Sequence, residues 1–169
     1  MLYTNDDVRR QDRLLPESCA IGILDSGEYG FLSMVDMLPD GASGSCVAYG
    51  VPVSYVWNHG DGIYIHCAPE GRKLRSMSQH AQVSFCVVGA THVCASSFTT
   101  AYESIVLNCE ASVCADDDER MRAIVMFLDK YAPHNAELGK TMAAKSMKRT
   151  CIIKLTIKRW SGKCKRVKE

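Results

Sequence analysis

The sequence predicts an α+β fold in which an antiparallel sheet curls into a small β-barrel with helices packed outside it. Three observations predict this fold. Several segments alternate apolar and polar residues, turn sequences join some of them as hairpins, and helical segments do not alternate regularly with strands. A chain of 169 residues with no internal repeat or low-complexity linker has the size of one domain. We therefore expect residues 1–169 to form a single domain.

The first half of the chain predicts two helices and four strands. Apolar residues recur at helical spacing after Pro16, and Gly27 ends that helix. Pro52 favours an edge or irregular position for one strand, and the turn residues at 58–62 join two strands as a hairpin. The expected elements are a helix over 16–26, strands over 31–35, 49–57, 63–67 and 82–88, a polar loop from Asp36 to Ser45, and a helix over 71–80.

The second half predicts two strands and two further helical segments. The longest alternation runs from Tyr102 to Cys114 and indicates a strand with one apolar face. Carboxylates from Asp116 to Glu119 suit a helix start, and Pro133 ends that helix. A weaker helical segment covers 136–146, and a final strand covers 151–158. The apolar stripe expected to face the core comprises Met121, Ile124, Val125, Leu128 and Ala132.

Composition and charge exclude several classes of protein. A hydrophobic content of 47% and a charged content of 23% are typical of globular proteins. The net charge of +1 gives no overall field that would attract nucleic acid, and we expect the basic residues after Ile157 to form a solvated end. No apolar stretch reaches the roughly 18 residues of a membrane span, and Met1 to Arg13 lacks the apolar core of a signal peptide. We expect a cytoplasmic protein with no membrane or nucleic-acid partner.

The chain contains nine cysteines, but their spacing signals neither a disulfide framework nor a zinc site. Several, such as Cys109, occupy positions of small apolar residues in alternating segments. His66-Cys67 and His92-x-Cys94 each offer two metal ligands, with no matching second pair. We expect reduced thiols and no metal site.

The junction from His66 to Lys73 carries the strongest chemical signal. A helix that begins there presents unpaired backbone N–H groups and the positive end of its dipole, and its first residues are Arg72 and Lys73. Cations oppose the dipole at this end, so a phosphate would relieve an unfavourable arrangement. The alternative is a solvated basic first turn with no ligand.

This junction also carries a family resemblance. The stretch Ile63 to Leu74 resembles the tyrosine-x-histidine, small residue, glycine-arginine/lysine-lysine signature of flavin-nucleotide-binding split-barrel proteins. These are relatives of pyridoxamine 5′-phosphate oxidase and include the Nim 5-nitroimidazole resistance proteins. Further matches follow the same order along nearly the whole chain, at residues 9–13, 50–55, 102–106 and 160–163. Their order is specific for the Nim-like branch.

The resemblance implies a six-stranded antiparallel Greek-key split β-barrel with flanking helices, which forms a homodimer and binds FMN at the subunit interface. It implies that Arg72 and Lys73 hold the phosphate and that His66, the expected catalytic residue, lies near the flavin. The loop from Asp36 to Ser45 is longer than in compact members, and Trp160 replaces a small polar residue. The resemblance therefore does not define the residues on the substrate side of the cleft. The further cofactor contacts implied are Val53, Ser54, Tyr55, Ser104, Ile105 and Trp160.

The sequence leaves two classes of function open. The first is an FMN-dependent oxidoreductase that reduces a small organic acceptor, such as a nitroaromatic, with electrons from NADH or NADPH. The second is a flavin- or haem-binding module without catalysis, because one fold hosts several functions. Two of the site residues have structural alternatives as well. Tyr55 could fill the barrel core, and His66 could be a hydrogen-bonded structural residue.

Overall fold

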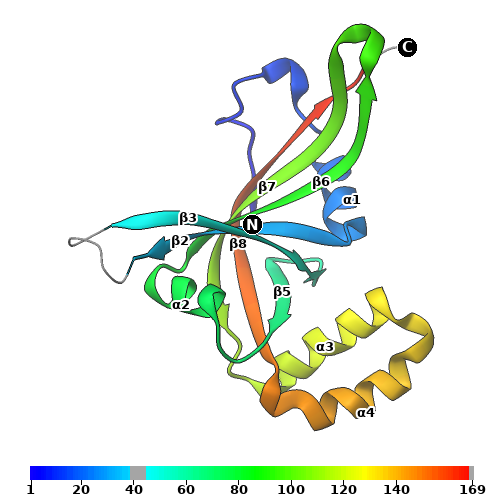
Figure 1. Ribbon diagram of the computed structural model, residues 1–169. Coiled ribbons are helices and arrows are strands. Elements are labelled where there is room, and N and C mark those ends of the chain that lie inside the picture. The colour runs from blue at the N-terminus through cyan, green and yellow to red at the C-terminus, as the bar shows by residue number, and fades with distance from the viewer. Residues whose placement is uncertain (39–44, 168–169) are drawn as a thin grey trace.

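The computed structural model describes residues 1–38 and 45–167, in which one curled sheet carries helices against its outside (Figure 1). The long strands β6, β7 and β8 run side by side through the molecule, and α3 and α4 lie together beside one end of β8. The elements are β1 (Leu2–Tyr3), α1 (Glu17–Ser26), β2 (Tyr29–Met37), β3 (Cys46–Ser54), β4 (Val56–Trp57), β5 (Gly62–Cys67), α2 (Arg72–Gln79), β6 (Gln82–Cys94), β7 (Thr99–Val113), α3 (Asp117–Tyr131), α4 (Ala136–Ser146) and β8 (Cys151–Lys165).

The sheet closes on itself through a single residue. Its strands follow the order β3-β2-β6-β7-β8-β5-β4 with antiparallel pairing, and β1 pairs in parallel with β8. β3 and β4 stand at opposite ends of this order, yet only Tyr55 separates them along the chain. The sheet must therefore curl until its two ends meet. The predicted α+β barrel is confirmed, and the strands other than the two-residue β1 and β4 supply the six that were expected.

Two apolar clusters hold the elements together. The larger fills the barrel interior and includes Leu32, Phe85 and Leu107, each fully buried. The smaller lies between α3 and the outside of β4, β5 and β8, and it is centred on Phe127 and Ile152. The expected stripe of α3 is thus right only in part, because Ile124 packs against this cluster while the most buried residues of the helix lie outside the stripe. The buried residues of that helix are Ala123 and Phe127, because the helix turns this face to the barrel.

Several strands run further than the sequence predicts. β2 continues through Asp36 and Met37 because each pairs with a residue of β3, so these two residues do not belong to the expected loop. Residues 39–44 of that loop lie outside the described residues. The expected strand over 49–57 is two strands, because the chain turns inward at Tyr55. The position predicted from Pro52 is confirmed, since β3 ends the strand order.

The length and the pairing of β8 differ from the sequence-based expectation. It extends to Lys165, so Trp160 lies within the strand and Lys163 and Lys165 are not part of a solvated end. The register against β7 shifts between Asn108 and Cys109, which pair with Arg159 and Ile157. Lys158 is the extra residue of this bulge. Lys158 and Arg159 are therefore both exposed, and the alternation that predicts a strand breaks there.

Candidate cofactor-binding site

The start of α2 has the features of an anion site. The chain leaves β5 at Cys67, passes through residues 68–71 and enters the helix from Gly71, whose φ of 139° favours glycine. No side chain caps the first turn, and no acidic residue occurs in it. The first turn therefore presents backbone N–H groups together with Arg72 and Lys73.

Arg72 is oriented by neighbours on the β2–β3 hairpin. Its Nε lies 2.7 Å from Oδ2 of Asp36, and its guanidinium carbon lies 4.1 Å from the centre of the Tyr49 ring. Asp36 also accepts a hydrogen bond of 2.7 Å from Ser76 Oγ on α2. Within residues 1–38 and 45–167, the two terminal guanidinium nitrogens of Arg72 make no hydrogen bond. Arg72 is thus fixed through Nε and keeps two donors for a ligand.

His66 lies close to this helix start, near the end of β5. Its ring meets the edge of Phe127 from α3, with 4.7 Å between ring centres. Desolvation and the charge of Lys73 lower the pKa of the imidazole, so its neutral form dominates at neutral pH. Its ring nitrogens make no hydrogen bond within the described part of the chain, and the side chain is exposed. The charge of Lys73 thus acts on the imidazole of His66, and Arg72 precedes Lys73 in the same helical turn.

Three other predicted contacts lie inside the barrel. Tyr55 is fully buried, where its hydroxyl donates to the Leu24 carbonyl at 2.6 Å, and burial raises its pKa. Ile105 is also fully buried, and Trp160 packs edge-on against Tyr3 with 5.0 Å between ring centres. These three side chains belong to the main core or its edge. Tyr55 therefore fills the barrel core, which is the structural alternative to a cofactor contact.

The remaining predicted residues lie on the barrel surface. Ser54 is exposed at the end of β3, and Val53 is half-buried against the core. Ser104 faces a shallow cavity of about 260 Å³ that Arg9 and Lys163 also line. Lys163 is the direct partner of Ser104 across β7 and β8. The sequence motifs at residues 9–13, 102–106 and 160–163 thus meet at one place.

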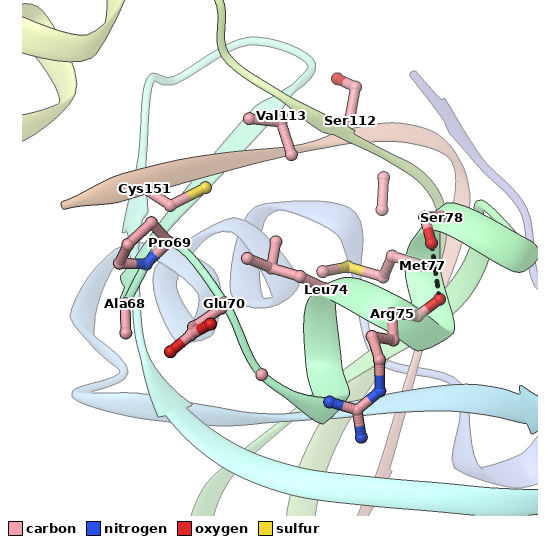
Figure 2. Close-up of a pocket in the computed structure, with 12 residues that line it drawn as sticks. Ala68, Pro69, Glu70, Leu74, Arg75, Met77, Ser78, Ser112, Val113 and Cys151 are labelled. Atoms are coloured by element: carbon pink, nitrogen blue, oxygen red, sulfur yellow. Dashed lines mark hydrogen bonds between the residues drawn. The ribbon is translucent and has the colours of Figure 1, made fainter. Parts of the chain in front are cut away.

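A large cavity lies against residues 68–71, the loop that leads to α2. It has a volume of about 970 Å³, and its wall is mostly apolar (Figure 2). His66, Arg72 and Lys73 do not line it. No sequence motif marks this cavity, because its wall combines residues from segments far apart in the chain. The wall is formed by Ala68, Pro69, Glu70, Gly71, Leu74, Arg75, Met77, Ser78, Ala111, Ser112, Val113 and Cys151.

Across the described ranges 1–38 and 45–167, no three His, Cys, Asp or Glu side chains come together as a metal site would require. In the same part of the chain, no helix has both the length and the apolar character needed to cross a membrane.

A comparison with known protein families identifies the family that has this architecture. A family model described as pyridoxamine 5′-phosphate oxidase matches residues 17–164. The chain belongs to the pyridoxamine 5′-phosphate oxidase family. The resemblance drawn from the motifs is confirmed at the level of family and fold. No curated protein sequence matches the chain significantly.

Solved structures of this fold include proteins with different ligands. A candidate 5-nitroimidazole antibiotic resistance protein from Bacteroides thetaiotaomicron is 15% identical, with a TM-score of 0.68 over 90% of this chain and 86% of that one. An FAD-binding protein from Mesorhizobium loti is 18% identical, with a TM-score of 0.60 over 91% and 97%. A haem storage protein from Vibrio cholerae is 18% identical, with a TM-score of 0.62 over 89% and 95%. At these identities the likeness shows the split-barrel fold and leaves the ligand open.

Proposed function

We propose that this member of the pyridoxamine 5′-phosphate oxidase family is an FMN-binding oxidoreductase that reduces a small organic acceptor, such as a nitroaromatic, with electrons from NADH or NADPH. The observation that carries the proposal is the uncapped first turn of α2, where Arg72 and Lys73 stand beside an exposed, neutral His66. This group combines an anion-binding end with a side chain that can exchange a proton.

The residues present fit the phosphate of FMN. Arg72 retains two guanidinium donors beside the N–H groups of the first turn, and Lys73 adds a charge. One helix start with adjacent cations suits one terminal phosphate, which favours FMN over the dinucleotide FAD. The Mesorhizobium loti protein is FAD-binding, so both flavins are compared in the experiment below.

When bound, the flavin supplies the redox chemistry, and the protein supplies position and proton exchange. His66 is placed to exchange a proton with a reduced acceptor, because the imidazole is exposed and makes no hydrogen bond within the described residues. Phe127 packs against the ring edge-on and limits its rotation.

A homodimer would bring the two parts of the site together. Ser104 lies eight residues before Ser112, which is about 26 Å along an extended strand, and Ser112 is at the end of β7 that faces α2. One chain therefore keeps Ser104 and Lys163 apart from Arg72. An outward row with exposed Phe31 and Val106 joins β2, β6 and β7, and it offers apolar surface for a second copy.

A haem-binding protein without flavin catalysis is the second candidate. The exposed, neutral imidazole of His66, without a hydrogen-bond partner in the described residues, suits an axial iron ligand. The similar Vibrio cholerae structure is that of a haem storage protein. The two cations Arg72 and Lys73 at the uncapped start of α2 favour the flavin over haem, because haem does not require a phosphate site.

The absorption spectrum of the purified protein tests the two candidates. Reconstitution with equal amounts of FMN, FAD and haem, followed by mass spectrometry of the retained group, is expected to yield FMN. Anaerobic addition of NADH or NADPH is then expected to bleach the flavin bands, and a nitroaromatic to restore them. Retention of haem alone would replace the proposal by the second candidate.

Free thiols at all nine cysteines fit the reducing cytoplasm, where we place the reaction.

A further inference from the structure

Cys67 and Cys151 oppose each other on neighbouring strands. Cys67 is the last residue of β5, Cys151 is the first of β8, and the two are direct partners in the antiparallel register. Directly opposed side chains project from the same side of a sheet. Among the strand pairings within residues 1–38 and 45–167, this is the one place where two cysteines are partners.

The strand geometry permits a bond between these two thiols. Opposed residues of antiparallel strands have Cα atoms about 4.5 or 5.5 Å apart, depending on the type of pair. A disulfide spans Cα separations of about 4.4–6.8 Å, so both types fall within its range. The thiols also interact as they stand. Burial, with a smaller contribution from Cys151, raises the pKa of Cys67 to about 11 against the opposing charge of Lys73.

An oxidant can reach Cys151, the first cysteine of the pair, through the large cavity. Cys151 lines the 970 Å³ cavity, and Figure 2 shows its sulfur beside Pro69, directed toward the cavity interior. Both cysteines are half-buried, which leaves the sulfurs accessible while the strands hold their positions. His66, Arg72 and Lys73 do not line this cavity, so access to the thiols is separate from the proposed phosphate site.

We propose that Cys67 and Cys151 form a reversible disulfide and act as a redox site that exchanges with low-molecular-weight disulfides in this cavity. The thiolate of Cys151 attacks one sulfur of the small disulfide and releases the first small thiol. The thiolate of Cys67 then attacks the Cys151 sulfur of the mixed disulfide and releases the second. Two protein thiols are oxidised, one small disulfide is reduced, and the two protons end on the two released thiols.

The charge of Lys73 assists the second step. It favours the thiolate of Cys67, whereas the charge of Cys151 opposes it. In the mixed disulfide Cys151 carries no charge, so the opposing contribution is gone and that of Lys73 remains. The site therefore works in the order that the cavity imposes, with Cys151 as the first nucleophile and Cys67 as the second.

Oxidised glutathione is the probe for this proposal. The full-length protein is incubated with it, alkylated after denaturation, and mapped by mass spectrometry. We expect a peptide link between Cys67 and Cys151, with the loss of two hydrogen atoms, about 2 Da. Dithiothreitol is expected to restore both thiols. Cys67→Ser is expected to trap a glutathione adduct on Cys151, and the exposed-thiol control Cys46→Ser to keep the link.

Cys114 provides the decisive comparison, because it also lies near Cys151. Burial, Glu119 and Cys151 together raise its pKa to about 11. If Cys151 links to Cys114, or if both Cys67 and Cys151 remain free in the wild-type protein, the proposal is overturned. Peptide mapping of the wild-type chain decides this even where a serine variant folds poorly. The result does not depend on whether the protein binds flavin.

Discussion

Asp36 on β2 anchors Arg72 on α2, with 2.7 Å between the Oδ2 of the carboxylate and the Nε of the guanidinium. Its other oxygen accepts a hydrogen bond from Ser76, one turn further along the helix. The hydrogen bond from Ser76, followed in size by that from Arg72, holds the pKa of the Asp36 carboxyl below its usual value. The barrel wall, rather than a capping residue, therefore sets the orientation of the first turn of α2.

Replacing Asp36 by asparagine is expected to change the pH dependence of stability. Because the pKa of Asp36 is lowered on folding, the carboxylate stabilises the fold above its usual value of 3.8, and this contribution is lost as the pH falls below it. The melting temperature of the wild-type protein should therefore fall more steeply than that of Asp36→Asn below pH 3.8. The exposed-residue control Asp129→Asn should follow the wild type. Parallel curves for wild type and Asp36→Asn would mean that the ion pair does not stabilise the fold.

Arg72→Ala and Lys73→Ala are each expected to weaken FMN binding by about 1.5–3 kcal/mol, the range for hydrogen bonds to charged groups. Fluorescence titration of the apoprotein measures the affinity. Arg122→Ala, which removes an exposed arginine on α3, serves as the matched control and should bind like the wild type. Unchanged affinity in both test variants would move the phosphate site away from α2.

The local part of the candidate site was predictable from the sequence, and the long-range part was not. His66, Arg72 and Lys73 lie within eight residues of one another, so one strand-to-helix junction brings them together. Asp36, which anchors Arg72, and Phe127, which packs against the ring of His66, come from distant segments, and no sequence pattern indicates either contact. The sheet pairing and the packing of α3 decide these contacts.

Bulges explain why strand lengths were underestimated. Alternation of buried and exposed residues holds along β7 from Ile105 to Ala111, because the extra residue of the β7–β8 bulge, Lys158, belongs to β8. On β6 the register shifts between Val88 and Thr91, and the predicted strand ends at Val88 although pairing continues to Cys94. A two-residue period stops at an inserted residue even where the backbone ladder resumes. The strand predicted over 151–158 stops short of Trp160 for the same reason, because the bulge of β8 lies at Lys158.

His66→Ala is expected to slow the oxidation of reduced flavin by a nitroaromatic by about 10²- to 10⁴-fold, the usual range for general acid catalysis, while the protein retains its flavin. The pKa of His66 is lowered, so its proton-donating form grows only as the pH falls below 6.5. The wild-type rate should rise in that range, and the rate of the variant should stay flat. Stopped-flow measurements on fully loaded samples test this, with exposed His134→Ala as the control. Equal rates in His66→Ala and wild type would make His66 a structural residue.

Tyr131→Phe is expected to destabilise the fold by about 1–3 kcal/mol, the cost of unpaired buried polar groups. The Tyr131 hydroxyl accepts a hydrogen bond from the N–H of Tyr55 at 3.1 Å and lies 2.8 Å from the carbonyl of the same residue. It thus satisfies the backbone where the two sheet ends join. Urea denaturation measures the loss. Tyr102→Phe is the control, since that hydroxyl makes no hydrogen bond within the described residues, and a similar loss in both variants would contradict the assignment.

Phe31→Asp is expected to convert a homodimer into monomers. Phe31 is 43% exposed in the single chain, and a buried aspartate at an apolar interface would lose its hydration. Light scattering should give twice the chain mass of 18.7 kDa for the wild type and the chain mass for the variant. Leu138→Asp, at an exposed position on α4, should remain dimeric. A flavin-loaded wild-type monomer would rule out a shared site.

The place of β8 in the sheet has a consequence for synthesis on the ribosome. This last strand, Cys151–Lys165, inserts between β5 and β7, so neither of these strands has its full set of neighbours until the C-terminal segment emerges. A nascent chain that stops earlier carries two unpaired strand edges, which are templates for aggregation. Barrel assembly must therefore wait until residues 151–165 have left the ribosome, and protection of β5 and β7 from solvent exchange should appear only from that point.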